Sequence, residues 1–310
     1  MRTTRAFSRT PQLMGSFEPG NPCGGYYNDL RGIPLEDGSP DAALRGLARM
    51  TRERRVANPV SVAQLGLGAW QLALDDTYWL PVVAAASDWL VAELDDEGRI
   101  PYLFALPHTY RLDPPWSSAM AQGEAASLLI RAASSLGRPE LADGAFAAAR
   151  SLLDERLGLV AETPEGPVLQ EYPTEPPAHV LNGWIFALWG LYDVSLGSPR
   201  PRGSGDEVAA CGAAFERGAR ALAARISRYD AGLSWSRYDL YPHRIVHVAS
   251  PFYHRLHIEQ LRAMARLRPL RAFAELADRW EDGARRPISR AAGLARKVAF
   301  RMLEPRKPPG

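Results

Sequence analysis

The sequence lacks the features that mark disulfide-rich, metal-binding and membrane-spanning proteins. Only two of its 310 residues are cysteines, Cys23 and Cys211, and their wide separation fits buried or free thiols better than a disulfide framework. No C-x-x-C, H-E-x-x-H or P-loop pattern is present. There is no run of about 18 apolar residues, and the basic N-terminus has no apolar signal-peptide core. The sequence therefore predicts a cytoplasmic protein without a transmembrane segment.

An excess of charge of one sign is also missing. The 37 basic and 35 acidic residues leave a formal net charge of +2, which gives no argument for binding nucleic acid. What the chain does have is core material, because 46% of its residues are hydrophobic and 23% are charged, as is typical of globular proteins. Its length suits one large domain or two ordinary ones.

The periodicity of apolar residues changes along the chain. Residues 1–57 are rich in glycine, proline and arginine and have weak periodicity, which predicts an irregular N-terminal arm. From Asn58, a candidate cap followed by Pro59, apolar residues recur at the three and four spacing of helices. Further helices are expected at about 79–94, 118–136, 139–155, 178–196, 206–228, 254–267 and 269–283, and we find no convincing set of alternating strands.

Three glycines, Gly98, Gly158 and Gly232, each follow a predicted helix and an acidic residue. The distance from one to the next is about that of two helices with their loops, which is one helical hairpin. Repeated helical hairpins usually form a solenoid or a closed toroid. We therefore expect an all-α fold, an (α/α) toroid or barrel over residues 58–283, with these loops gathered at one end.

Residues 284–310 are predicted to form a basic helix and tail. Four apolar residues, Leu294, Val298, Phe300 and Met302, lie among arginines and a lysine. We favour a helix that docks on the surface of the core. Contact with a polyanion or a membrane surface, which would make the protein membrane-peripheral, is the alternative interpretation.

Polar and aromatic residues gather in three clusters, the first of which is Asp113–Ala132. Ser117 or Ser118 can cap a helix whose first turns contain Gln122 and Glu124. Capping explains the serines well. Two polar residues in an otherwise apolar helix are harder to explain by packing alone, and they are therefore candidates for a binding site.

The second cluster is Glu171–Asp193. Glu171 and Tyr172 lie directly before a proline, which holds Tyr172 in an extended conformation. His179 and Asn182 are three residues apart, so we expect them to share one helical face. A single glutamate or histidine here would be read as a surface acid or a capping residue. Four polar residues ahead of a strongly apolar helix fit a functional site better.

The third cluster, residues 234–261, is rich in tyrosine and histidine. It contains Tyr238, Tyr241, Tyr253, His243, His247, His254 and His257. The three-residue spacing of His254 and His257 could suggest a metal, but no carboxylate or thiol completes a ligand set. No metal is expected, and capping and packing at the start of the helix near Tyr253 is the alternative.

In this order, the clusters resemble the C-terminal domain of D-glucuronyl C5-epimerases. The matching strings are PWSSAMAQGEAASLLIRA, EYPTEPPAHVLNGWIFALWGLYD, YDL and YHRLHIEQL, with NPVSVAQLGLGAW ahead of them. The similarity covers about residues 25–283. It implies an (α/α) toroid that converts D-glucuronate to L-iduronate within a heparosan-like polysaccharide, without a redox cofactor. It also implies an anionic uronate-containing polysaccharide or glycan as partner and leaves a homodimer open.

This reaction makes clear demands on side chains. The hydrogen at C5 leaves from one face of the sugar and a proton returns to the other, so two acid/base groups must face each other across the ring. The carboxylate gains charge in between, and cationic or hydrogen-bonding groups must neutralise it. A tyrosine, with a pKa of about 10, needs a nearby cation to act as a base, whereas a glutamate, near 4.3, must be raised by burial.

The resemblance places Glu171 and Tyr253 at the opposed acid/base pair of the family and leaves open which of them removes the proton. Tyr172 and Tyr238 match its other active-site tyrosines and would hold or polarise the carboxylate. The substrate-binding candidates are Trp116, Gln122, Glu124, His179, Asn182, His243, Arg244, His254 and His257.

The chain departs from the family pattern after Tyr238. Animal members follow their YDL with an arginine, which binds the substrate carboxylate, and a histidine. Here Tyr241 and Pro242 come first, so His243 or Arg244 is expected to take over. Animal members also carry a β-rich N-terminal domain where this chain has a short arm.

Three other functions remain open. A polysaccharide lyase on the same toroid would share the C5 carbanion. A glycoside hydrolase would need a second acid beside Glu171, for which Glu124, Asp193 and Asp239 are candidates. A glycan-binding protein without activity is the non-enzymatic alternative.

Overall fold

The chain is mostly helical in this computed structural model, which describes residues 12–52, 57–106, 108–197, 199, 201 and 203–306. Its helices are α2 (Gly32–Leu35), α3 (Pro40–Thr51), α4 (Pro59–Ala73), α5 (Leu80–Glu93), α6 (Ala119–Ser135), α7 (Leu141–Ser151), α8 (Leu181–Ser195), α9 (Gly205–Arg225), α10 (Pro251–Leu267), α11 (Arg271–Arg285) and α12 (Pro287–Leu303). Short 3-10 turns cover Thr77–Trp79, Glu155–Leu157 and Ile226–Tyr229, and β1 (Val160–Ala161) pairs antiparallel with β2 (Val168–Leu169). The all-α prediction is confirmed. None of the described helices is long and apolar enough to cross a membrane.

Capping side chains set the predicted helix starts. Asn58 accepts hydrogen bonds from two backbone N–H groups of the first turn of α4, and Pro59 occupies its first position. Of the two candidate serines, Ser118 caps α6 by accepting from the N–H of Ala121. These bonds satisfy N–H groups that a helix leaves unpaired at its start. Both predicted helix starts are confirmed.

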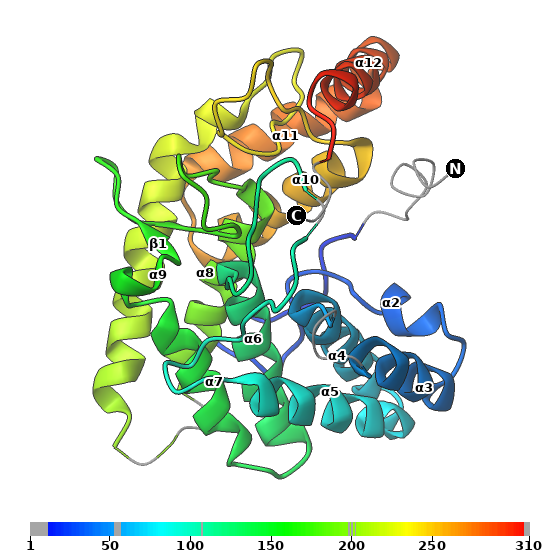
Figure 1. Cartoon of the computed structure of the whole chain (residues 1–310), viewed down its shortest axis with the longest axis vertical. Helices are drawn as coiled ribbons and strands as arrows, with labels where there is room; N and C mark the ends of the chain where they lie inside the picture. Colours follow the sequence, from blue (N-terminus) through cyan, green and yellow to red (C-terminus); the bar gives the residue numbers. More distant parts are fainter. Residues whose placement is uncertain are drawn as a thin grey trace.

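The helices follow one another as four hairpins, in the colour order of Figure 1. Helices α4, α6, α8 and α10 each pack on the next in this order, and each also packs on the helix that follows it in the sequence. Gly98, Gly158 and Gly232 all have positive φ, the left-handed conformation that favours glycine. In the described part of the chain, α10 is not among the helices that pack closely on α4. Closure into a toroid therefore stays a prediction.

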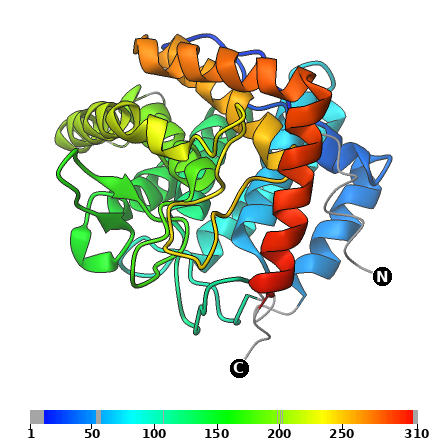
Figure 2. The same ribbon diagram turned by 90° about the horizontal axis from the view of Figure 1, so that it is seen from above.

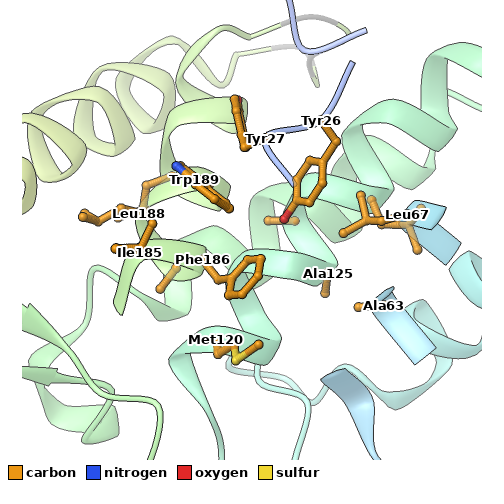
Figure 3. Packing of buried hydrophobic residues seen from close by; sticks show 14 of the residues in the cluster. Tyr26, Tyr27, Ala63, Leu67, Met120, Ala125, Ile185, Phe186, Leu188 and Trp189 are labelled. Atoms are coloured by element: carbon orange, nitrogen blue, oxygen red, sulfur yellow. The ribbon is translucent and has the colours of Figure 1, made fainter. Parts of the chain in front are cut away.

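Helices α6 and α8 approach each other most closely at two glycines. A Cβ atom at Gly190 would lie 2.4 Å from the Cα of Gly123, and one at Gly123 would lie 2.5 Å from the Cα of Ala187. Because only glycine fits at this distance, the two positions fix how the helices pack. Figure 3 shows Met120 of α6 and Trp189 of α8 in the core that surrounds this contact.

The N-terminal segment is more regular than the sequence suggests. Ser39 caps α3 and Pro40 occupies its first position, so the expected irregular structure is corrected at residues 40–51. Tyr26 and Tyr27 pack on Trp189, with 6.0 and 4.9 Å between the ring centroids (Figure 3). The apolar stripe of α3 is narrow and lies among arginines, which hides the helical periodicity.

Helix α12, red in Figures 1 and 2, packs on α11 and α10. Phe300 is fully buried, whereas Leu294, Val298 and Met302 are 43%, 39% and 76% exposed. The prediction that this helix docks on the core is confirmed, although only one of the four apolar side chains is buried. The polyanion or membrane contact and the segment boundaries at 57 and 283 stay predictions.

Candidate active site

A second group of buried aromatic side chains lies apart from the main core. It is formed by Tyr102, Tyr110, Leu112, Trp116, Ala121, Tyr172, Ala178, Val180 and Tyr238, with Tyr241 and Tyr253 packed against it. Most of these residues belong to the segments that precede α6, α8 and α10. The structure thus brings the three polar-aromatic clusters of the sequence to one place.

All four acid/base candidates lie in this group or beside it. Tyr172 follows Glu171 in the sequence, and the ring centroids of Tyr238 and Tyr253 are 4.9 Å apart in an edge-on arrangement. Burial raises the pKa of Tyr172, and charges on Glu171, Tyr238 and Tyr253 raise it further. The four side chains therefore share one electrostatic environment. Their catalytic roles stay predictions.

Glu171 is a buried carboxyl group with few compensating partners. Its side chain is 6% exposed, and burial raises its pKa to about 7, against a smaller lowering by a hydrogen bond with Tyr172. Asn182 Nδ2 donates to Glu171 Oε2 over 3.4 Å. A Cβ atom at Gly183 would lie 2.3 Å from the same oxygen, so glycine makes the room for the carboxyl group. A pKa near 7 lets this group both take and give a proton at neutral pH.

Two further candidates, Trp116 and Asn182, lie at the site. The Trp116 ring stacks on Tyr102 at 3.9 Å and is 6.0 Å from the ring of Tyr172, and its Nε1 donates to the backbone oxygen of Phe104. Asn182 contacts Glu171 directly, as described above. Both lie beside the acid/base candidates, and a substrate contact for either stays a prediction.

His179 does not share a helical face with Asn182. Val180 is extended and α8 begins at Leu181, while His179 has a φ of 48°. The His179 Nδ1 atom lies 3.1 Å from Nη2 of Arg225. Burial lowers the pKa of His179 to about 4, and the charge of Arg225 lowers it further. The prediction that His179 and Asn182 share a helical face is wrong, because His179 lies outside the helix. The His179 ring contacts Arg225 of α9.

Gln122 is engaged inside the protein. It is fully buried, its Oε1 accepts from the N–H of Ile100, and its Nε2 donates to the backbone oxygen of Gly98 and to Ser151 Oγ. It ties the 98–100 loop to α6 and α7. Its amide group is thus used to hold the fold together, and a substrate contact for Gln122 stays a prediction.

Glu124 is also fully buried and accepts from Gln64 Nε2 at 2.9 Å. Burial raises the pKa of Glu124 well above its usual value, and the charge of Glu171 raises it further. Glu124 therefore lies within electrostatic reach of Glu171. A direct substrate contact for Glu124 stays a prediction.

The two histidines of α10 are buried, and both contact the hydroxyl group of Ser236. His254 stacks on Trp235 at 3.9 Å, and its Nδ1 lies 2.9 Å from Ser236 Oγ. His257 Nδ1 also lies 2.9 Å from this hydroxyl group, and its ring centroid is 6.5 Å from that of Tyr253. His254 thus holds the loop around Ser236, and only His257 lies near an acid/base candidate.

Sequence reasoning missed His108, the one histidine outside the second and third clusters. Its ring lies 4.6 Å from Tyr110 and 4.7 Å from Tyr172 between centroids. Its Nδ1 is buried without a hydrogen-bond partner among the described residues, and burial lowers its pKa well below the usual value. His108 stands in a loop without helical period, so no spacing rule pointed to it.

Asp239 is the centre of a buried hydrogen-bond network. The Tyr110 hydroxyl group and the Nδ1 of His247, at 2.6 Å, contact Asp239 Oδ2, and His243 Nε2 lies 3.2 Å from it. Burial acts to raise the pKa of Asp239, but hydrogen bonds with His243 and His247 hold it below its usual value. Arg244, the other residue expected to bind the substrate carboxylate, is exposed, and its backbone N–H donates to Glu304.

Within the described residues, three members of this network are placed so that they could hold a metal ion. Ligand atoms of Asp239, His243 and His247 lie within 4.8 Å of one another. However, the ammonium group of Lys297 lies 2.7 Å from the other nitrogen of His247. Since an ammonium group beside the site repels a cation, we interpret the group as a hydrogen-bonded network, in which all the partners contact Asp239 Oδ2 and the buried Oδ1 has none among the described residues.

Lys297 is the second residue that sequence reasoning missed. It belongs to α12, is 5% exposed, and its Nζ lies 5.6 Å from the centroid of the Tyr238 ring. Burial lowers the pKa of Lys297 to about 7. A basic helical end is usually solvated, so the sequence gave no reason to expect a buried lysine.

Comparison with known proteins adds independent support. A family model described as D-glucuronyl C5-epimerase C-terminus matches residues 94–282, which include Glu171, Tyr172, Tyr238 and Tyr253. The D-glucuronyl C5-epimerase of Caenorhabditis elegans is 30% identical over 209 residues, 63% of this chain and 34% of the relative. The chain thus matches about a third of the length of that protein. More than half of the chain matches the family model, and the chain therefore belongs to the D-glucuronyl C5-epimerase C-terminal family.

Proposed function

We propose that the chain is an isomerase that epimerises uronic acid residues at C5 in a polysaccharide or glycan, of the D-glucuronate to L-iduronate type. The observation that carries this proposal is the Glu171 carboxyl group. It is buried among tyrosines, has a pKa of about 7, and lies in the segment that matches the family. A structural carboxylate would be expected to have a cation beside it, whereas this one is left able to exchange a proton.

The proposed mechanism uses proton transfer from both faces of the sugar. Glu171 exchanges a proton with C5 on one face and Tyr253 does so on the other. One C–H bond is broken and another is formed, so the reaction needs no oxidant. Tyr172 hydrogen-bonds Glu171 and Tyr238 packs edge-on against Tyr253, and both hydroxyl groups would hold the substrate carboxylate.

The environment of the other acids does not favour a glycosidase. A hydrolase needs a second carboxyl group across the bond to be cleaved. Asp193 is ion-paired with Arg131 at 2.6 Å, with both side chains fully buried. Asp239 is held by two histidines and a tyrosine, and Glu124 is fully buried and accepts a hydrogen bond from Gln64. None of the three is left as a solvated partner for Glu171.

The test is exchange of the C5 hydrogen. The protein is incubated with a glucuronate-containing polymer such as heparosan in deuterated water, and C5 is followed by NMR. We expect deuterium at C5 together with iduronate. Chain shortening with a new double bond would instead identify a lyase. Binding of the polymer without any exchange would identify a glycan-binding protein and refute the proposal.

A further inference from the structure

Helix α12 directs two basic side chains to the candidate site, although it lies outside residues 94–282, the part that matches the family. Lys297 is 5% exposed and Arg301, one turn further on, is partly buried. Arg290 of the same helix is exposed. Lysine is almost never buried without a partner, so the position of Lys297 needs an explanation beyond docking of the helix.

Lys297 is bonded into the Asp239 network. Lys297 Nζ lies 2.7 Å from His247 Nε2, and in its protonated form Lys297 only donates, which makes Nε2 the acceptor and leaves the Nδ1 of His247 to donate to Asp239. Phe300 stacks on the His247 ring with 3.8 Å between centroids, which holds the ring in place. The same ammonium group lies 5.6 Å from the Tyr238 ring centroid. Lys297 therefore places positive charge beside an active-site tyrosine.

Arg301, on the next turn, contacts the loop that precedes Tyr110. Its Nη1 donates to Thr109 Oγ1 at 3.0 Å, in the loop that also carries His108 and Tyr110. Burial lowers the pKa of Arg301, whereas charge on Tyr238 and Tyr253 would raise it. The guanidinium group is thus within electrostatic reach of both rings.

The chemistry at Tyr238 requires such cations. A uronate carries a carboxylate that gains charge when the C5 proton leaves, and a cation beside Tyr238, which would hold that carboxylate, stabilises the added charge. The loop after Tyr238 does not supply this charge, because Arg244 is exposed and His243 is bonded to Asp239. Helix α12 supplies positive charge at that place from another part of the chain.

We propose that α12 is part of the active site, in which Arg301 binds the uronate carboxylate and Lys297 is a positioning residue that holds positive charge beside Tyr238. This inference rests on the proposed function, because it assigns the substrate contact of the same site. It explains why the loop after Tyr238 can lack the arginine that binds the substrate carboxylate in animal members of the family.

Binding tests the Arg301 contact. The ligands are a heparosan oligosaccharide and its carboxyl-reduced form, which is neutral, and affinity is measured by calorimetry. Loss of a charge-assisted bond should weaken binding of the uronate ligand by Arg301→Met about 10- to 100-fold. The affinity for the carboxyl-reduced ligand should not change, nor should either affinity in the control Arg290→Met. Equal losses for both ligands, or none, would overturn the Arg301 assignment.

Catalysis and stability together test Lys297. In Lys297→Met we expect kcat for C5 deuterium exchange to fall about 10-fold or more with little change in KM, since a buried hydrogen-bonded charge is lost. The melting temperature at pH 6 should rise, because burying the ammonium group disfavours the folded state. A lysine with a purely structural role would instead lower the melting temperature and leave kcat nearly unchanged, and that result would overturn the proposal.

The proposed epimerase function and the proposed role of α12 can be refuted independently of each other. A wild-type protein that binds the uronate oligosaccharide but never exchanges C5 would refute epimerisation. The contrast between the two ligands in Arg301→Met would still decide whether α12 holds the carboxylate. If exchange occurs and both α12 variants match the wild type, epimerisation stands and the role of α12 is refuted.

Discussion

Two buried charged groups of this chain differ in how completely they are paired. In the main core, Arg131 and Asp193 are both fully buried and joined at 2.6 Å. The hydroxyl groups of Tyr27 and Ser127 donate to the two oxygens of Asp193, and Arg131 also donates to the backbone oxygen of Gly25. This network ties the N-terminal segment to α6 and α8.

In the candidate site, Glu171 is buried almost as deeply but has much weaker support. Its hydrogen-bond partners, Tyr172, the backbone of Gly183 and Asn182 at 3.4 Å, are all uncharged, and burial raises the pKa of its carboxyl group to about 7. The comparison shows that the chain can pair a buried charge fully when structure requires it. Glu171 is therefore better explained by chemistry than by stability.

The largest effect should come from removing the acid/base pair. Glu171→Gln and Tyr253→Phe should each lower C5 deuterium exchange by about 100- to 10,000-fold, the contribution of one general acid or base. Exchange is measured by NMR, and circular dichroism should show a folded protein in both cases. Turnover near that of the wild type in either variant would refute the assignment.

The core network should respond in stability. Arg131→Met leaves Asp193 buried without its partner and should lower the free energy of unfolding by about 3–5 kcal/mol in urea. Arg138 offers a matched control, because its ion pair with Asp88 lies at the surface, and Arg138→Met should cost less than about 1 kcal/mol. Similar small losses in both variants would remove the contrast between the two regions.

The pH dependence of stability should show that ionisation of the buried Glu171 carboxyl group destabilises the fold. Its folded-state pKa of about 7 lies above the unfolded value, so its ionisation destabilises the protein increasingly as pH rises from about 4.5 to 7. Glu171→Gln should therefore raise the unfolding free energy by up to about 3 kcal/mol at pH 8 and by almost nothing at pH 4. A gain independent of pH would contradict this explanation.

The smallest effect should follow from moving the carboxyl group without removing it. Gly183→Ala places a Cβ atom 2.3 Å from Glu171 Oε2, and the displaced carboxyl group should reduce kcat about 10-fold. In Gly212→Ala of α9 the nearest atom is 3.5 Å away, so activity should be unchanged. Equal activity of the two variants would show that the position of Glu171 is not critical.

The sequence predicted those parts of the fold that depend on local chemistry. Asn58 and Ser118 each stand directly before a segment in which apolar residues recur at helical spacing, and each caps the predicted helix. Similar reasoning missed α3, because its apolar stripe is narrow. The family resemblance located Glu171 and Tyr253, about eighty residues apart in the sequence, and the structure brings their segments together.

Other site residues could not be predicted because they depend on tertiary contacts. Gln122 was chosen as a polar residue in an apolar helix, yet it pairs with a loop that only the fold brings near. His179 was placed on a helical face that begins two residues later. Lys297 comes from a helix beyond the matching region, and nothing in the local pattern shows that its side chain is buried.

The glycine contact between α6 and α8 also has a mechanical meaning. Two helices in backbone contact at Gly123 and Gly190 have little room to shift against each other, and Glu171 lies in the loop directly ahead of α8. The other half of the site, with Tyr253, belongs to α10, which joins α8 through a smaller contact. Since Glu171 is only 6% exposed, the proposed reaction would require the segments that cover it to part, and separating α8 from α10 would break fewer contacts than separating α8 from α6.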